Sequence, residues 1–368
     1  MTSRILKTAA LAALALAALA CNGDAGPTPT PAETGRTPSP SPSDDTPTPR
    51  LTPAPAAKGW RTLAPMPTPR SEVAVAEFGG KIYVIGGFEG DGASSAKVEV
   101  YDPETDTWGQ APSLPEPRHH AAAVSYSFGT LGSRLLVIGG FGIAFNDPKS
   151  DVFEYTEEDG RWSENPPMLT ARGAHAATLY DNHPVAIGGV GVTSGDQTGN
   201  LSSVERMALP SREWSERGES LNVARDHLGA ASVMVFQTGA GFEQLHAIGG
   251  RSDLQFSRNL DTNESATSGG QWRERSRLPT ARSGIAAVSF RLRGSGPRIY
   301  VFGGESPEGT FDVVEVYDPD QDVWTTGPSM PTARHGLGAA VVGDTIYVIG
   351  GGERPGLSVS GANEAFTP

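Results

Sequence analysis

Six arginines recur at a fixed distance after six tryptophans in this sequence. Each arginine follows its tryptophan by ten residues, or by eleven in one case. A guanidinium group can hold a carboxylate through two parallel hydrogen bonds, so a ring of arginines could clamp an acidic ligand. Each arginine could instead have a structural role and donate to backbone carbonyls between neighbouring repeats. The pairs are Trp60 and Arg70, Trp108 and Arg118, Trp162 and Arg172, Trp214 and Arg225, Trp272 and Arg282, and Trp324 and Arg334.

Histidines recur within three residues of four of these arginines, which raises the question of acid–base or metal chemistry. Imidazole groups transfer protons near neutral pH and are common zinc ligands. No set of them stands at a spacing typical of a zinc site, so we predict no metal and no cofactor. We expect these histidines to pack or form hydrogen bonds beside the strand that follows each arginine. They are His119, His120, His175, His227 and His335.

The elements that would position these residues are short strands in six similar units of about fifty residues. Each arginine precedes a strand of small and β-branched residues, which suits a crowded position. A second, apolar strand then ends in two adjacent glycines. A third strand, such as Val98–Tyr101, turns at Asp102-Pro103 into the strand that carries the tryptophan. The glycine pairs begin at Gly86, Gly139, Gly188, Gly249, Gly303 and Gly350.

This order of arginine, small strand, Gly-Gly, Tyr-Asp-Pro turn and tryptophan resembles the kelch motif. The resemblance implies an all-β fold, a six-bladed kelch β-propeller with four-stranded antiparallel blades. The last unit lacks a tryptophan, whereas Trp60 precedes the first arginine without a blade of its own. We therefore predict that an N-terminal strand around Trp60 completes the C-terminal blade, whose third strand lies near 363–366.

Two of the six units depart from this pattern. Residues 259–270 of the fourth unit are polar and rich in serine, threonine and glycine. The third unit has Val204–Met207 in the third strand without a Tyr-Asp-Pro turn. We expect weaker strands or local disorder in both places.

The arginines and the Gly-Gly exits should surround one mouth of the central channel. In an antiparallel meander, the start of the first strand and the end of the second lie at the same edge of the sheet. The loops that leave the glycine pairs carry aromatic and charged residues, which suits a binding rim. These loop residues include Phe145. We predict a ligand site formed by the six arginines together with Phe88, Phe141, Arg251 and Arg354.

Residues 1–21 resemble an export signal. Arg4 and Lys7 precede a run of alanine and leucine that ends at Cys21, the only cysteine of the chain. The position of Cys21 resembles a bacterial lipobox, although Ala18-Leu19-Ala20 also fits ordinary signal cleavage. We expect a lipidated Cys21 and a membrane-anchored lipoprotein on the extracytoplasmic side, with free secretion as the alternative.

Residues 22–58 repeat Thr-Pro and Ser-Pro and have almost no large apolar side chain to bury. They predict a disordered linker between the signal and a propeller at 59–368. The formal net charge of −13 argues against nucleic acid as a partner. We expect a monomer, because closing the ring hides the strand edges that would otherwise pair with other chains.

Two functional hypotheses arise from the resemblance. Kelch propellers commonly act as platforms, which implies a non-catalytic scaffold for a protein, peptide or glycan, an acidic one if the arginines face it. The alternative is a carbohydrate-active enzyme, because exported six-bladed kelch proteins resemble the bacterial sialic acid mutarotases. Glu305, Glu353 and His120 would then be the acid–base candidates. We favour the scaffold, since fold alone does not establish activity.

Several catalytic classes find no support in the sequence. Copper radical oxidases also use kelch propellers, but their tyrosine–cysteine cofactor needs a cysteine inside the propeller, and none comes after Cys21. The chain contains no G-x-S-x-G elbow and no phosphate-binding P-loop.

Overall fold

The computed structural model describes residues 58–194, 197–237, 240–255, 257–291 and 296–368. The predicted signal segment, Cys21 and almost all of the predicted linker lie outside these ranges. Within them, no helix is long and apolar enough to cross a membrane. The described residues form strands, turns and loops, with one 3-10 helix at Gly129–Leu131.

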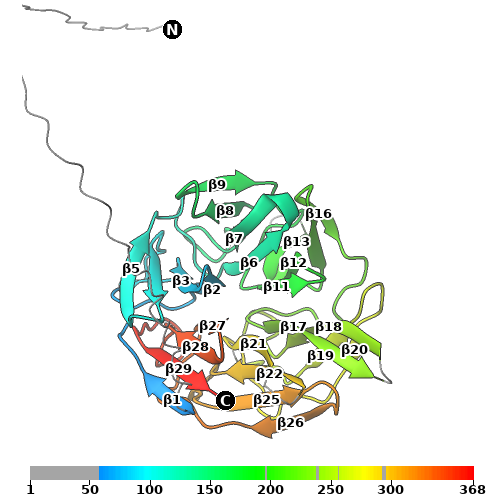
Figure 1. Cartoon of the computed structure of the whole chain (residues 1–368). Helices are drawn as coiled ribbons and strands as arrows, with labels where there is room; N and C mark the ends of the chain where they lie inside the picture. Colours follow the sequence, from blue (N-terminus) through cyan, green and yellow to red (C-terminus); the bar gives the residue numbers. More distant parts are fainter. Residues whose placement is uncertain (1–57, 195–196, 238–239, 256, 292–295) are drawn as a thin grey trace, which may run out of the picture. The chain divides into compact units, whose positions relative to one another are not determined.

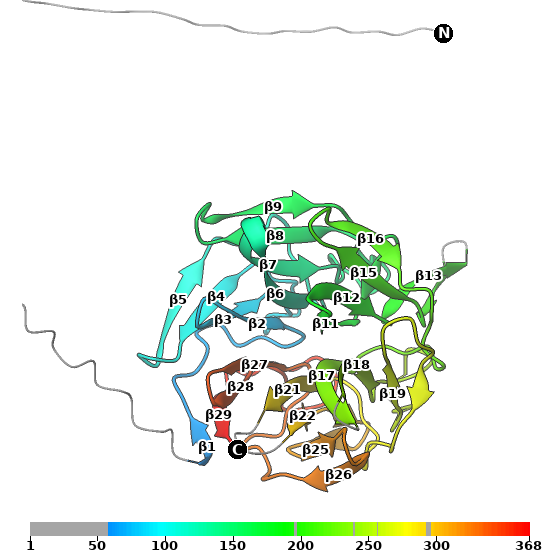
Figure 2. The ribbon, with the colours of Figure 1, turned by 45° about the vertical axis from the view of Figure 1, so that its right-hand side comes forward.

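Six four-stranded antiparallel sheets stand around a central channel as the blades of a propeller (Figures 1 and 2). We number the blades 1 to 6 in the order of their inner strands along the chain. Small residues dominate most of the inner strands, because six strands converge at the axis. The inner strands are β2 (Ala74–Phe78), β6 (Ala122–Phe128), β11 (Ala176–Tyr180), β17 (Gly229–Gln237), β21 (Ala286–Arg291) and β27 (Gly338–Val342).

The second strand of each blade is the apolar run before the glycine pair. Its residues are largely buried on both faces, because a neighbouring blade packs on each side. These strands are β3 (Lys81–Ile85), β7 (Gly132–Ile138), β12 (His183–Ile187), β18 (Ala240–Ile248), β22 (Pro297–Phe302) and β28 (Thr345–Ile349).

The third and outer strands complete each meander. The third strands are β4 (Val98–Asp102), β8 (Val152–Thr156), β15 (Val204–Ala208), β19 (Asn263–Ala266), β25 (Val314–Asp318) and β29 (Asn363–Thr367). The outer strands are β5 (Thr107–Ala111), β9 (Arg161–Asn165), β16 (Glu213–Glu216), β20 (Arg273–Glu274), β26 (Val323–Thr326) and β1 (Gly59–Thr62).

The contact between neighbouring blades requires the glycine pairs. Gly86 and Gly87 have φ angles of 62° and 91°, in the left-handed region that favours glycine. A Cβ on Gly86 would lie 2.4 Å from the carbonyl oxygen of Arg118 in the next blade. The Gly87 N–H donates to that same oxygen at 2.7 Å. Equivalent bonds join every blade to the next, including Gly351 to Arg70 across the closure.

The first and last strands of the domain pair with each other, as the sequence predicts. β1 runs antiparallel to β29, and Trp60 stands opposite Phe366 with ring centroids 5.0 Å apart. The indole of Trp60 donates to the carbonyl of Pro328, which belongs to the preceding blade, at 2.9 Å. The final blade therefore combines one N-terminal strand with three C-terminal strands, and the predicted closure is confirmed.

Tryptophans tie the outer strands of neighbouring blades together. In five of the six blades, the indole N–H donates to a backbone carbonyl just beyond the outer strand of the preceding blade. Blade 3 is the exception, because Trp214 Nε1 is buried without a protein partner. Besides the bond of Trp60, these bonds run from Trp108 to Ala64, Trp162 to Pro112, Trp272 to Glu219 and Trp324 to Ser276.

The two irregular units form complete blades with local departures. In blade 4, β19 has four residues and β20 has two, which agrees with the weak strands expected there. In blade 3, β15 has five residues and is regular, so the expectation of a weak strand is wrong for that blade. Blade 3 departs elsewhere: after its glycine pair, β13 (Val190–Ser194) and β14 (Gln197–Asn200) form an extra hairpin beside β10 (Arg172–Gly173).

We predict that closure depends on Trp60. The substitution Trp60→Ala should lower the free energy of unfolding by about 2–3 kcal/mol, because it removes a half-buried aromatic side chain and its hydrogen bond across blades. Urea denaturation followed by tryptophan fluorescence measures this. Arg61→Ala on the same strand is the control, since Arg61 is exposed and its loss should change stability by less than about 0.5 kcal/mol. Equal stability of the two variants would contradict the assigned closure.

Candidate functional site

The six arginines lie inside the blades, where at most 1% of each is exposed. Five of them pair with a buried glutamate on the third strand of their own blade; Arg70 meets Glu99 at 2.8 Å and Arg334 meets Glu364 at 2.6 Å. The guanidinium groups also donate to backbone carbonyls next to the glycine pairs. The remaining pairs of this kind are Arg172 with Glu205, Arg225 with Glu264 and Arg282 with Glu315.

In blade 2, other residues neutralise the charge of the buried arginine. Phe153 occupies the glutamate position of its third strand, and the guanidinium carbon of Arg118 lies 5.4 Å from the centre of that ring. Arg118 pairs instead with Asp151 at 2.9 Å and with Glu116 at 3.0 Å. In every blade the charge of the arginine is therefore neutralised within the blade.

This arrangement corrects the predicted arginine-lined mouth. Each guanidinium is surrounded by carbonyls and a carboxylate of its own blade, so none faces the channel as a ligand clamp. The alternative, that the arginines have a structural role, is correct. Their side chains form hydrogen bonds within their own blade, however, and it is their backbone carbonyls that accept the hydrogen bonds between blades. The correction applies to Arg70, Arg118, Arg172, Arg225, Arg282 and Arg334.

The residues two positions after each arginine form a closed ring around the channel. Each has a φ between 51° and 65°, and each backbone N–H donates to the carbonyl of its counterpart in the preceding blade at 2.7–3.0 Å. The last member bonds back to the first, so six hydrogen bonds make a complete circle. We call these the ring residues; they are Glu72, His120, Ala174, His227, Gly284 and Gly336.

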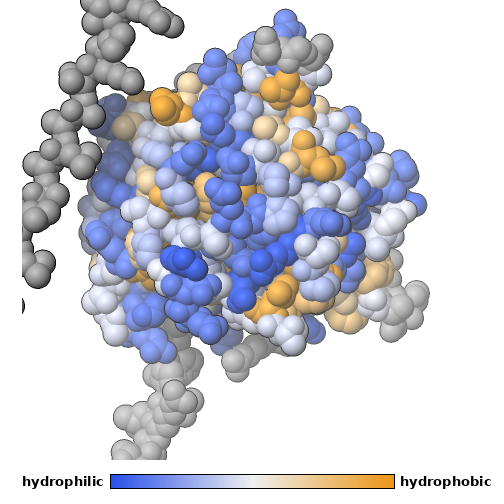
Figure 3. Space-filling view, turned by 90° about the horizontal axis from the view of Figure 1, so that it is seen from above, coloured by the Kyte–Doolittle hydropathy of each residue, from blue (hydrophilic) through white to orange (hydrophobic). Residues whose placement is uncertain are grey.

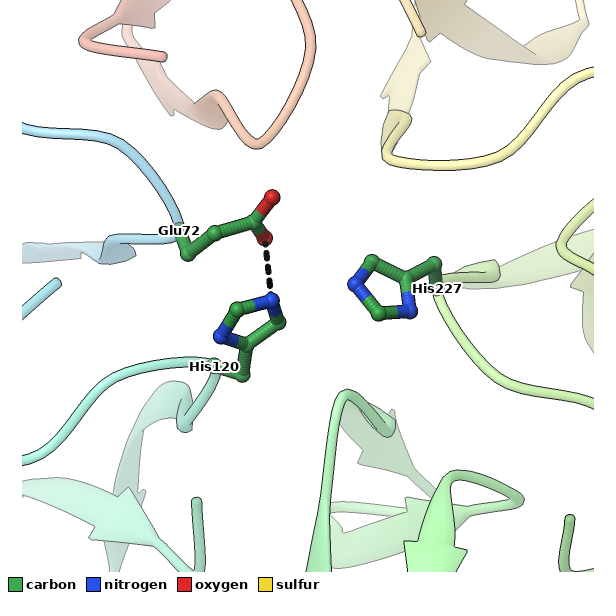
Figure 4. A group of neighbouring side chains, drawn as sticks. All are labelled: Glu72, His120 and His227. Carbon is green, nitrogen blue, oxygen red and sulfur yellow. Dashed lines mark ion pairs between the residues drawn. The ribbon is translucent and has the colours of Figure 1, made fainter. Parts of the chain in front are cut away.

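Three of the ring residues carry side chains that point toward one another across the channel (Figure 4). Glu72 Oε2 lies 3.3 Å from His120 Nε2, and the ring of His227 is 4.8 Å from that of His120 between centroids. A left-handed backbone at a residue other than glycine costs about 1–3 kcal/mol and is concentrated at functional sites. The other ring positions are alanine or glycine, so a side chain is not needed for the ring to form.

Further charged groups surround Glu72, His120 and His227, which we call the triad. Asp226 accepts a hydrogen bond from His227 Nδ1 and another from Arg251 Nε at 2.9 Å. Arg251 also donates to Glu305 Oε1 at 3.2 Å. His335 lies between two carboxylates, with Nδ1 3.4 Å from Glu72 and 3.6 Å from Glu305.

These contacts set the protonation of the site. Burial opposes ionisation of Glu72, but the neighbouring histidines outweigh it, His120 most strongly, and hold the pKa of its carboxyl well below the usual range. Burial would lower the pKa of His335, but the adjacent carboxylate of Glu72, with help from that of Glu305, raises it.

An aromatic stack borders one side of the triad. The ring of His119 lies between Phe88, at 4.1 Å, and Phe141, at 5.3 Å, and its Nδ1 is 2.6 Å from Nδ1 of His120. Burial lowers the pKa of His119 to about 4, so its ring is neutral at neutral pH. Phe145 packs against this stack, with its ring centroid 5.1 Å from that of His120, and about half of its surface remains exposed.

The site opens into a cavity of about 520 Å³ at the mouth of the channel, which we call the mouth cavity. One half of its wall is apolar and comes from the loops of blades 1, 2 and 6 after the glycine pairs; it includes Phe88, Ile143, Phe145 and Leu357. The other half and the floor are charged and comprise Glu72, His120, His227, Arg251, Glu305 and His335.

Beyond the triad, the channel narrows and then widens. A space of about 90 Å³ lies at the level of the ring residues, and a larger one of about 540 Å³ is lined by the small residues of the inner strands. His175 lines both and is buried with no hydrogen-bond partner, so burial lowers its pKa to about 3. It therefore packs as a neutral group, as expected for the histidines from the sequence.

The predicted rim residues divide into two groups. Phe88, Arg251 and Phe145 line the mouth cavity, and Phe141 supports it from below. Arg354 is exposed and does not line the cavity.

The three catalytic candidates divide in the same way. Glu305 and His120 line the mouth cavity, whereas Glu353 is exposed outside it.

Sequence reasoning missed Glu72, His227 and His335 as site residues and missed the apolar pair Ile143 and Leu357. A signal was present for the first three, because they occupy the two positions directly after an arginine. Those positions read Ser-Glu, His-His, Gly-Ala, Asp-His, Ser-Gly and His-Gly from blade 1 to blade 6.

Three comparisons place the chain among known proteins. The Kelch motif family model matches residues 69–115 and 286–331, which correspond to blades 1 and 5. Kelch-like protein 23 of Mus musculus is 27% identical over 272 residues, which are 73% of this chain and 43% of that protein. Kelch-like protein terF of Aspergillus terreus is 28% identical over 328 residues, covering 83% of this chain and 66% of that protein. The chain thus spans less than two thirds of either relative.

A solved structure, described as "Structure of YjhT", superposes with a TM-score of 0.63. It is 14% identical in sequence, and the match covers 82% of this chain and 96% of that one. At this identity the likeness supports the propeller fold.

We predict that the buried arginine–glutamate pairs stabilise the blades as units. Glu205→Gln should lower the free energy of unfolding by about 3 kcal/mol, because it leaves the charge of Arg172 buried without its counter-ion. Urea denaturation of Glu213→Gln, an exposed glutamate in the same blade, provides the control. The double variant Arg172→Met, Glu205→Leu should recover part of the loss. A single variant as stable as the wild type would show that the pair is dispensable.

Proposed function

This chain belongs to the kelch-repeat family of β-propellers, and from that premise we propose that it is a binding scaffold whose mouth cavity receives a segment of a protein partner. Kelch repeats support a protein-binding scaffold in general. The mouth cavity supplies the particular observation: three large apolar side chains stand exposed around it. Ile143 is 87% exposed, Phe145 54% and Leu357 62%.

Exposed apolar side chains that gather at a concave site indicate a surface that becomes covered. On the face seen in Figure 3, hydrophilic and intermediate residues predominate and the apolar ones form separate patches. The mouth cavity has a volume in the range of small-ligand pockets, so it can take one or two side chains of a partner rather than a whole helix. The charged floor would then orient polar groups of the same segment.

The acidic preference that the sequence suggested for the ligand loses its basis. Among the predicted arginines, Arg251 is the one that lines the mouth cavity, and it already contacts Asp226 and Glu305. The floor contains both signs of charge, with Glu72 and Glu305 facing Arg251 and His335. We propose a partner segment with an apolar side chain next to a hydrogen-bonding group, and no requirement for net negative charge.

The proposal includes the location of the scaffold. The pattern of residues 1–21 and the Thr-Pro and Ser-Pro repeats of 22–58 support an exported propeller held away from a membrane by lipidated Cys21. In this arrangement the mouth cavity meets partners outside the cytoplasm.

The scaffold can be tested with a random peptide library displayed on phage. Peptides selected on the full-length protein should bind with a Kd that rises at least tenfold in Phe145→Ser or Ile143→Ser, because each loses an apolar contact at the rim. Isothermal titration calorimetry measures the Kd. Phe236→Ser is the matched control, since Phe236 is 51% exposed but lies near the far end of β17. Binding that is equal in all variants, or failure to enrich any peptide, would refute the proposal.

One observation favours a second candidate, an acid–base enzyme acting on a sugar. Asp226 holds His227 by its Nδ1, and His227 Nε2, which lies 3.1 Å from Arg251 Nη2, is the candidate base at the floor of the mouth cavity. Proton NMR exchange spectroscopy on N-acetylneuraminic acid tests this candidate. Faster exchange of the anomers with wild type, lost in His227→Gln, would establish catalysis. Exchange no faster than in buffer would exclude the mutarotase activity.

A further inference from the structure

We propose that Glu72, His120 and His227 form a binding site for one divalent transition-metal ion of the zinc type, between the mouth cavity and the inner channel. One potential ligand atom from each residue lies within 4.8 Å of the other two. The three residues come from blades 1, 2 and 4 and meet only because the ring residues face one axis (Figure 4). This inference goes beyond the proposed function, because it concerns an ion rather than a partner.

The donor set suits such an ion. Two imidazoles and one carboxylate are a common three-residue set for zinc, which leaves a fourth position for water or a ligand. With bonds of about 2.0–2.1 Å, tetrahedral ligand atoms lie about 3.4 Å apart. Glu72 Oε2 and His120 Nε2 already stand at 3.3 Å. The ligand atoms of the three residues lie within 4.8 Å of one another, so a side-chain movement of up to about 1.4 Å would complete the geometry.

The surroundings of both histidines are those of metal ligands. A ligating histidine usually donates its other ring N–H to a neighbouring group, which fixes the tautomer and the orientation of the ring. His227 Nδ1 is bonded to the buried carboxylate of Asp226, and Nε2 is directed toward Glu72 and His120. His120 Nδ1 is 2.6 Å from His119 Nδ1, so an ion on Nε2 leaves a proton on Nδ1 for that bond.

Charge balance also leaves room for a cation. Three carboxylates of the site, on Glu72, Asp226 and Glu305, stand beside one permanently charged cation, the guanidinium of Arg251. His335 approaches Oε1 of Glu72, and Oε2 is the oxygen nearer His120. The ion has an entry path through the mouth cavity, which is lined by all three ligands.

Binding of the ion would displace one existing contact, between Arg251 and His227. Arg251 Nη2 lies 3.1 Å from His227 Nε2, at the lone pair that the ion would use. Arg251 has two other partners, Asp226 and Glu305, and can keep both when its contact with His227 Nε2 is lost. The guanidinium therefore competes with the ion, and its removal should strengthen metal binding.

The test uses the full-length protein carrying Cys21→Ser, which removes the only thiol. Zn²⁺ titrated by isothermal calorimetry should bind at one ion per chain, and Co²⁺ should give the visible absorption of a tetrahedral site. His120→Ala, His227→Ala and the conservative Glu72→Gln should each raise the Kd at least tenfold. His183→Ala, which changes a histidine of β12 outside the mouth cavity, should bind as the unsubstituted protein does.

Arg251→Gln provides a result that misfolding cannot produce, because it should lower the Kd for Zn²⁺ by threefold or more. Absence of stoichiometric Zn²⁺ binding, equal Kd values in the three ligand variants, or no gain in Arg251→Gln would each overturn the proposed site. Peptide binding measured in EDTA separates this outcome from that of the proposed function, since the apolar rim residues Ile143 and Phe145 are not ligands.

Discussion

The burial of a guanidinium group in every blade is the constraint on which the rest of this structure depends. An unpaired charge in the interior would be very unfavourable, so each arginine needs a carboxylate and several carbonyls around it. The third strand supplies the carboxylate in five blades, as Glu99 does for Arg70, and the segment at the glycine pair supplies carbonyls. Three segments of a blade are thereby held at one point, next to the channel.

The position of each arginine determines the path of the chain into the inner strand. The arginine's backbone carbonyl accepts a hydrogen bond from the second glycine of the preceding blade, so the chain must turn before the inner strand begins. The left-handed ring residues make this turn and bond to one another in a circle. Side chains two residues after the arginines, such as Glu72 and His227, are therefore directed toward the axis by the same contacts that join the blades.

The backbone repeats in six blades, but the side chains at equivalent positions differ from blade to blade, and these differences create the site. Charged groups come mainly from blades 1, 2 and 4 to 6, whereas exposed apolar groups come from the loops of blades 2 and 6. A rigid circle of hydrogen bonds holds the floor, while Ile143 and Leu357 stand on loops above it. Such a site combines a preorganised polar base with an apolar rim, which lowers the ordering cost of binding.

The sequence by itself determined the repeat, the order of strands in each blade and the closure through Trp60, because these features depend on local patterns that recur at a fixed spacing. It also identified the face of the channel that carries the loops and named Arg251, Glu305, Phe88 and His120 on it. The direction of the arginine side chains was decided only by the tertiary structure. Arg70 and Glu99 are 29 residues apart, and nothing in either segment alone shows that they meet. The triad of Glu72, His120 and His227 likewise spans more than 150 residues, so it exists only once closure of the ring brings three blades to one axis.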